Sequence, residues 1–144
     1  MKIYLDNCCF NRPFDDQSRL RIKLESEAKL KIQEDIRAGI FGLVWSYILD
    51  YENSRNPFHE RREQLSKWRN YAQDDIEAST ELIEIANRIT AIGIKKTDSL
   101  HIACAIMANS DYFLTTDDGI IKKSISIDDV KITDPIGFIK EVMQ

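Results

Sequence analysis

The stretch "TDSLHIACAIMANSDYFLTTDD", residues 97–118, joins a helix, a short loop and a strand. Thr97 and Asp98 suit the first turn of a helix, and the small apolar residues that follow suit its buried face. Residues 111–116 are rich in strand-favouring side chains and lead directly into two acids. This pattern predicts a helix beside a strand, with carboxylates where the strand ends.

The same alternation of strands and helices extends in both directions along the chain. Further strands are predicted at residues 2–6, 40–46, 74–79 and 130–133, and helices at 18–37, 47–55, 58–71, 81–91 and 135–142. Residues 40–46, "IFGLVWS", are almost continuously apolar, which is typical of a strand covered on both faces. Residues 11–16, "NRPFDD", are expected to form a turn or loop. Gly39 suits the end of the long second helix.

This order predicts an α/β fold: one domain over residues 1–144, with a central parallel sheet and helices on both faces. In such sheets a ligand crevice lies beyond the carboxyl ends of the strands. The length and the 43% hydrophobic content fit one globular domain with a core of its own.

Composition narrows the class of protein. The net charge of −4 gives no overall basic footprint for nucleic acid, although a local basic patch is compatible with it. No apolar run reaches the roughly 20 residues of a membrane helix, and the first residues do not resemble a signal peptide, so we expect a cytoplasmic protein. The three cysteines, Cys8, Cys9 and Cys104, are expected to be small buried side chains.

Acids stand at four of the predicted strand ends and helix starts. Each has an ordinary structural explanation, as a helix cap, a turn former or a solvated charge. In a parallel sheet, however, all of them face the same edge, and clustered carboxylates repel one another unless a cation is bound. An all-oxygen set favours Mg²⁺ or Mn²⁺ and suits metal-assisted hydrolysis of a phosphodiester. These candidate catalytic and metal-binding residues are Asp6, Glu52, Asp98 and Asp117.

Three segments carry a resemblance to a known family: "IYLDNCCFNRP", "LVWSYILDYENSRNP" and "TDSLHIACAIMANSDYFLTTDD". Together they resemble the PIN-domain nucleases, particularly stand-alone bacterial members similar to the toxin ribonucleases of toxin–antitoxin pairs. The resemblance implies a Rossmann-like three-layer domain, one or two Mg²⁺ or Mn²⁺ ions and cleavage of single-stranded RNA. It also implies the same four acids. Asp50 competes with Glu52 for the second position, and Asp118 competes with Asp117 for the fourth.

Substrate contacts are expected at Asn7, Arg12, Ser46 and Thr115, the last two as groups that orient a ligand or water. Positive walls for RNA are expected among basic residues near the same edge, namely Arg12, Arg55, Lys95, Lys96, Lys122 and Lys123. His101 is expected to be a packed or helix-surface residue and not a ligand.

Two other functions compete with the nuclease prediction. A catalytically silent PIN-like module would bind RNA or protein, although all four acids are present. A phosphotransfer domain would need acids that are missing, since Cys8 stands where a second acid would follow Asp6. The resemblance to toxins implies an antitoxin partner that covers the acidic crevice. A homodimer is also expected, through the helix within residues 14–37, whose apolar stripe is otherwise explained as a core face. That stripe comprises Leu20, Leu24, Ala28, Ile32 and Ile36.

Overall fold

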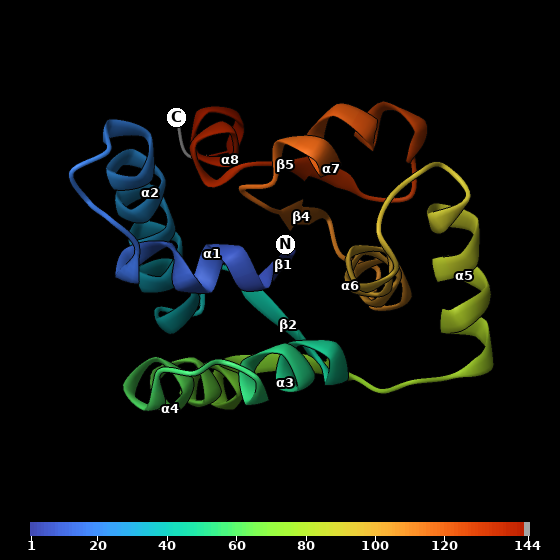
Figure 1. Cartoon of the computed structure of the whole chain (residues 1–144), viewed down its shortest axis with the longest axis horizontal. Helices are drawn as coiled ribbons and strands as arrows, with labels where there is room; N and C mark the ends of the chain where they lie inside the picture. Colours follow the sequence, from blue (N-terminus) through green and yellow to red (C-terminus); the bar gives the residue numbers. More distant parts are fainter. Residues whose placement is uncertain (143–144) are drawn as a thin grey trace.

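A five-stranded, fully parallel sheet in the order β3-β2-β1-β4-β5 runs through the computed structural model, which describes residues 1–142. Its strands are β1 (Lys2–Leu5), β2 (Gly42–Ser46), β3 (Ala72–Ile76), β4 (Tyr112–Leu114) and β5 (Lys131–Thr133). Figure 1 shows α2 (Leu20–Arg37) and α8 (Pro135–Val142) on one face of the sheet, and α5 (Thr80–Thr90) and α6 (Lys96–Met107) on the other. The predicted parallel α/β architecture is therefore confirmed.

Shorter helices complete the chain. They are α1 (Asn7–Asn11), α3 (Tyr47–Ser54), α4 (His59–Lys67) and α7 (Asp118–Lys123), with the 3₁₀ turns η1 (Arg12–Phe14), η2 (Trp68–Tyr71) and η3 (Ser124–Ser126). In Figure 1, α1 and α7 lie in front of the strands, and α3 and α4 lie along the side of the sheet where β2 is seen.

The middle of the sheet is buried from solvent, as expected for a parallel sheet with helices on both faces. Ile3, Tyr4 and Leu5 of β1 are fully buried, and so are Leu43 and Val44 of β2. The register pairs Leu5 with Leu114, so β1 and β4 end side by side. The residues that follow these two strands are thereby brought to one edge of the sheet.

Local capping explains where several helices begin and end. The Ser46 hydroxyl accepts a hydrogen bond from the backbone N–H of Leu49 and starts α3, and Ser79 starts α5 in the same way through Leu82. Gly39 has φ +77°, a conformation that glycine adopts without strain, just after α2. The predicted helix end at Gly39 is confirmed.

Three element predictions need correction. A loop was expected at residues 11–16, but residues 11–14 belong to a short helix, capped by the Asp6 carboxylate, and to the 3₁₀ turn that follows it. The predicted helix over 58–71 ends at Lys67 and continues as η2. The third strand lies at Ala72–Ile76 and not at 74–79.

The predicted apolar stripe of α2 is only partly a core face. Ala28, Ile32 and Ile36 are buried, but Leu20 and Leu24 are 71% and 45% exposed. The first two turns of α2 therefore leave apolar surface uncovered. None of the helices within residues 1–142 is long and apolar enough to cross a membrane.

Candidate active site

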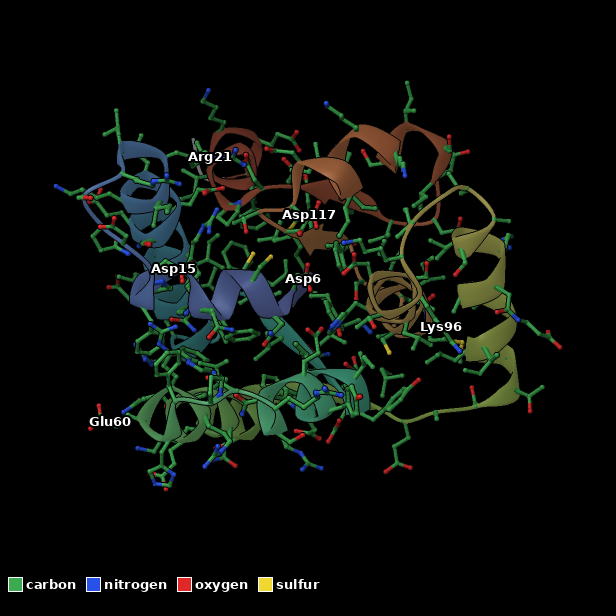
Figure 2. The ribbon with its side chains drawn as sticks, viewed as in Figure 1. Asp6, Asp15, Arg21, Glu60, Lys96 and Asp117 are labelled. Atoms are coloured by element: carbon green, nitrogen blue, oxygen red, sulfur yellow. The ribbon has the colours of Figure 1, made fainter. Side chains whose placement is uncertain are left out.

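Four acids from distant parts of the sequence line one open cavity of about 350 Å³ at the carboxyl edge of the sheet. Asp6 directly follows β1, Asp117 lies three residues after β4, Glu52 lies in α3 and Asp98 lies in the first turn of α6. Figure 2 shows Asp6 and Asp117 near the centre of this edge. Asn7, Cys8, Arg12 and Thr116 complete the lining.

Asp6 is the most deeply placed of the four, with 5% of its surface exposed. One carboxylate oxygen accepts a hydrogen bond from the backbone N–H of Asn7, at 2.8 Å. The other accepts from the Thr115 hydroxyl at 2.9 Å and from the Cys8 thiol at 3.4 Å. These donors, a backbone amide, a hydroxyl and a thiol, hold the carboxylate in one orientation.

Glu52 is held by His101, a residue whose role the sequence analysis did not anticipate. His101 is fully buried, and its Nε2 is hydrogen-bonded to the Glu52 carboxylate and lies 3.8 Å from the carboxylate of Asp6. Burial lowers the pKa of His101, but the hydrogen bond to Glu52 and the nearby acid charges outweigh it and raise the pKa overall. The expectation of a packed histidine is therefore confirmed, and the structure adds that its ring faces the acids.

A chain of hydrogen bonds fixes the other side of the imidazole. Nδ1 of His101 lies 2.6 Å from the Tyr4 hydroxyl, which lies 2.6 Å from the Ser46 hydroxyl. With the proton on Nε2, His101 donates to Glu52 and its Nδ1 accepts from Tyr4. With the proton on Nδ1, the Nε2 lone pair is free to bind a cation. The sequence contains one indication that His101 lies near the acids. It is three residues from Asp98, and residues three apart share a helix face.

Asp98 is destabilised in its charged form. Its pKa is raised to about 6, first by burial and then by the negative charges of Asp6 and Asp117. This is the signature expected of carboxylates gathered without a counter-ion. Asp117 also lines the cavity, although its carboxylate accepts hydrogen bonds from the backbone N–H groups of Gly119 and Ile120 and caps α7.

The two competing acids point elsewhere. Asp50 accepts a hydrogen bond from the indole N–H of Trp45 at 2.9 Å and lies 3.6 Å from the guanidinium of Arg69. Asp118 is paired through both carboxylate oxygens with Arg21, at 2.8 Å each. Neither lines the cavity that contains Glu52 and Asp117.

Two of the expected substrate contacts, Ser46 and Thr115, are bonded to other residues of the protein. Ser46 and Thr115 are fully buried, so neither hydroxyl reaches the cavity surface. Ser46 holds Tyr4 and caps α3, and Thr115 holds Asp6. These hydroxyls hold Tyr4 and Asp6 in place, and contact of Ser46 or Thr115 with a substrate stays a prediction. Asn7 and Arg12 do line the cavity.

Arg12 is anchored by a fully buried acid on α2. Its Nε donates to Glu25 at 3.1 Å, and another guanidinium nitrogen donates to Asp15 at 3.2 Å. The same Glu25 oxygen lies 3.5 Å from the guanidinium of Arg21. Arg21 also donates hydrogen bonds to the Thr116 carbonyl and to the Asp118 carboxylate. Figure 2 shows Arg21 and Asp15 on the α2 side of the acids. Glu25 thereby connects two cationic side chains at the rim of the site.

The other basic residues divide into two groups. Lys95 and Lys123 line a smaller cavity of about 250 Å³ that shares Asp98 and Asp117 with the acidic one. Arg55 donates instead to the Tyr51 hydroxyl at 2.7 Å, and neither Lys96 nor Lys122 lines either cavity. Lys96 lies on the side of α6 that faces α5 (Figure 2). Lys95 and Lys123 thus adjoin the acids in the smaller cavity, whereas Arg12 lines the acidic cavity itself.

The donor atoms fit a metal ion. One ligand atom each from Asp6, Glu52 and His101 lies within 4.8 Å of the others, and Asp98 and Asp117 line the same cavity. Carboxylate oxygens with one imidazole nitrogen can bind a divalent cation.

Comparison with known proteins supports the architecture. No family model and no curated protein matches the chain. Among solved structures it is similar to the crystal structure of VapBC2 from Rickettsia felis bound to a DNA fragment from their promoter. That match has a TM-score of 0.58 and 16% identity, and covers 93% of this chain and 98% of the other. The parallel sheet, the helices on both faces and this likeness confirm a three-layer α/β fold, which is consistent with the PIN-like, Rossmann-like domain that the sequence predicts.

Proposed function

We propose that the protein is an endoribonuclease that depends on Mg²⁺ or Mn²⁺ and hydrolyses phosphodiester bonds in single-stranded RNA. The observation that carries this proposal is the meeting of Asp6, Glu52, Asp98 and Asp117 in one cavity. Arg12 lines the same cavity but is paired with Glu25 and Asp15, so the cluster still suits a cation that in turn attracts a phosphate.

Asp6 and Glu52 are the central ligands, with His101 beside both and with Asp98 and Asp117 across the cavity. A divalent ion bound there supplies a lowered pKa for the attacking water and stabilises the charge that develops on the phosphate. Thr115 and the backbone of Asn7 keep Asp6 in place, and Tyr4 keeps His101 against Glu52. These neighbours hold the ligands in one geometry before a substrate arrives.

Cationic side chains beside the acids hold the RNA backbone. Arg12 lines the acidic cavity, and Lys95 and Lys123 line the cavity next to it. A strand that crosses both cavities has phosphates near these residues on either side of the scissile bond. Asn7 adds an amide at the acidic cavity for contact with sugar or phosphate oxygens.

The activity is tested with purified protein, a fluorescent single-stranded RNA, the matching DNA, and Mg²⁺ or Mn²⁺ with a chelator control. Cleavage of RNA that the chelator stops and that Asp6→Asn abolishes supports the proposal. Binding of RNA without cleavage under any metal condition contradicts it and favours a silent binding module. Sequencing the ends of the products then defines the cleavage site.

We also propose that a partner protein restrains the nuclease. The likeness to VapBC2 and the resemblance to toxin ribonucleases support this, as does the exposed apolar surface of Leu20 and Leu24 on α2. Expression in the host with and without the neighbouring gene tests it, since a toxin arrests growth only when that gene is absent. Light scattering tests the proposed homodimer against the 16.7 kDa mass of one chain.

A further inference from the structure

A cavity of about 580 Å³ lies apart from the acidic one. Its lining residues come from α1, η1, α2, α4 and η2, and none of them lines the acidic cavity. Glu60, which marks its α4 wall, is far from Asp6 and Asp117 in Figure 2. We refer to it as the α2–α4 cavity. Its buried floor comprises Phe10, Lys29, Gln33, Leu65 and Trp68.

Lys29 is an unusual residue for such a floor. It is only 3% exposed, yet no carboxylate within residues 1–142 forms an ion pair with it. Its ammonium group lies 5.3 Å from the centre of the Phe10 ring and 6.0 Å from that of Trp68. Burial, with a smaller effect of Arg37, lowers its pKa to about 7. A buried lysine normally has an anionic partner, and this one has only aromatic rings.

A second unusual residue of the floor is Gln33. It is also 3% exposed, and its Nε2 is buried without a hydrogen-bond acceptor in the part of the chain that the structure describes. It follows Lys29 by one helical turn, so both side chains lie on the same face of α2. Arg37 is one turn further along, with its guanidinium 4.6 Å from the Trp68 ring centre. Three donors therefore line this wall of the cavity in succession.

The acids across the cavity do not satisfy these donors. Glu60 and Glu63 are exposed residues of α4, and the Glu63 carboxylate is paired with His59 at 3.1 Å. No hydrogen bond joins either acid to Lys29 or Gln33 among the described residues. A buried donor without an acceptor costs about 1–3 kcal/mol. What the floor lacks is an oxygen acceptor, preferably one that carries negative charge.

We propose that the α2–α4 cavity binds a small molecule that bears an oxyanion, a carboxylate or a phosphate, on an apolar body. The oxyanion accepts from Lys29 Nζ and Gln33 Nε2, and the apolar body covers Leu65 and the ring edges of Phe10 and Trp68. The volume is within the range of pockets for such ligands, and a few placed donors among apolar residues are their usual lining. This site is independent of the proposed nuclease activity.

Solution NMR of the full chain tests the proposal, with benzoate and inorganic phosphate as the two separate probes. The reporters are the side-chain amide of Gln33 and the indole N–H of Trp68. A saturable shift of both signals is expected with at least one probe. The probe that binds more tightly shows whether the apolar body or the phosphate charge contributes more. Absence of saturable shifts with both probes, up to tens of millimolar, overturns the site.

Matched variants make the test specific. Lys29→Met keeps the length of the side chain and removes the charge, and it is expected to weaken binding at least about tenfold. Lys23→Met removes an exposed charge from the same helix and is expected to leave binding unchanged. Gln33→Leu, which retains Lys29, gives a second measurement with an expected loss of several-fold. Equal binding by wild type and Lys29→Met contradicts the proposal.

Discussion

His101 Nε2 is hydrogen-bonded to the carboxylate of Glu52, although 49 residues separate them in the sequence. The contact joins the first turns of α6 to α3, and the Tyr4 hydroxyl of β1 fixes the other ring nitrogen. Three elements thereby determine where one acid of the cavity points. Metal sites in proteins depend on residues that hydrogen-bond to the ligands, and the loss of such a residue weakens metal binding roughly 10–100-fold.

Tyr4→Phe tests this arrangement without removing any acid. The variant keeps the ring that stacks on Phe113 but loses the hydroxyl that holds His101. We expect affinity for Mn²⁺ to fall about tenfold, measured by calorimetry, with a smaller change of kcat once the metal is saturating. The matched control is Tyr112→Phe, which loses a hydroxyl bonded to Glu141 on another part of the surface. Unchanged Mn²⁺ affinity in Tyr4→Phe would contradict a positioning role for Tyr4.

Glu52→Gln and Asp50→Asn compare two acids of one short helix. Glu52 lines the acidic cavity, whereas Asp50 is held by Trp45 and Arg69. We expect cleavage of RNA to fall at least about 100-fold in Glu52→Gln, because a ligand charge is lost. Asp50→Asn is expected to stay within about threefold of wild type, since surface changes away from the site have small effects. Initial rates at saturating Mg²⁺ measure both, and equal losses would rule out Glu52 as the specific ligand.

The sequence was sufficient for the sheet and for the edge at which the acids lie. The nearly continuous apolar run at residues 42–46 indicates a strand covered on both faces, and parallel topology brings the residues that follow the strands to one edge. The sequence was insufficient for side-chain partners. His101 and Tyr4 each look like core residues, and only the three-dimensional structure shows that they meet Glu52.

Burial of charge was equally hard to foresee. Glu25 and Lys29 stand four residues apart on α2, where a pattern of charges usually indicates a solvated face, yet both are buried. Glu25 has two arginine partners from separate segments, one of them outside the helix, and Lys29 has two aromatic rings. Contacts between distant segments decide both cases, and no local periodicity records them. The exposed Leu20 and Leu24 reverse the same expectation at the start of the helix.

Asp98→Asn is expected to stabilise the protein when a chelator keeps it free of metal. The folded-state pKa of Asp98 is raised to about 6 by burial and by Asp6 and Asp117. Above pH 6 the folded protein therefore bears the full cost of the charged Asp98 carboxylate. This cost falls as the pH is lowered from 6 toward 3.8, the ordinary pKa of an aspartate. At pH 7.5 we expect a gain of up to about 2 kcal/mol after solvent screening.

Thermal unfolding with and without Mn²⁺ measures this effect independently of catalysis. Wild type is expected to gain stability on addition of Mn²⁺, and Asp98→Asn is expected to gain much less, because it has lost one acid of the cavity. Asp111→Asn changes a carboxylate that accepts from the backbone of Lys2, away from the cavity, and provides the control for Mn²⁺ response. A full Mn²⁺ response in Asp98→Asn would show that Asp98 does not contribute to metal binding.

Glu25→Gln is expected to affect both stability and substrate binding. The variant removes the buried negative charge between Arg12 and Arg21, at a cost of about 1–3 kcal/mol. Because Arg12 then loses its anchor at the acidic cavity, KM for RNA should rise several-fold while kcat changes less. Glu27→Gln, an exposed acid on the same helix, is the matched control. A lower kcat with an unchanged KM would contradict the role of Glu25 in holding Arg12 for the substrate.

Lys29→Met is expected to make the protein more stable, by an amount that depends on pH. The pKa of Lys29 is about 7 in the folded protein, depressed first by burial and then by Arg37, against an ordinary value of 10.5. Between these two values the unfolded chain binds a proton that the folded chain lacks, so the stability of wild type rises with pH. Below pH 7 the full penalty applies, with an upper bound of about 5 kcal/mol.

Urea unfolding of wild type and Lys29→Met from pH 6 to pH 10 measures the difference in the free energy of unfolding. The stabilisation by methionine should be largest at pH 6, where the lysine is charged in the folded state, and should shrink steadily as pH rises toward 10. The lost contacts with the Phe10 and Trp68 rings offset part of the gain at every pH. Lys23→Met, with its exposed side chain, should show no such trend. A difference between Lys29→Met and wild type that stays constant over this pH range would mean that Lys29 titrates normally and that its ammonium group is not held in a desolvated cavity.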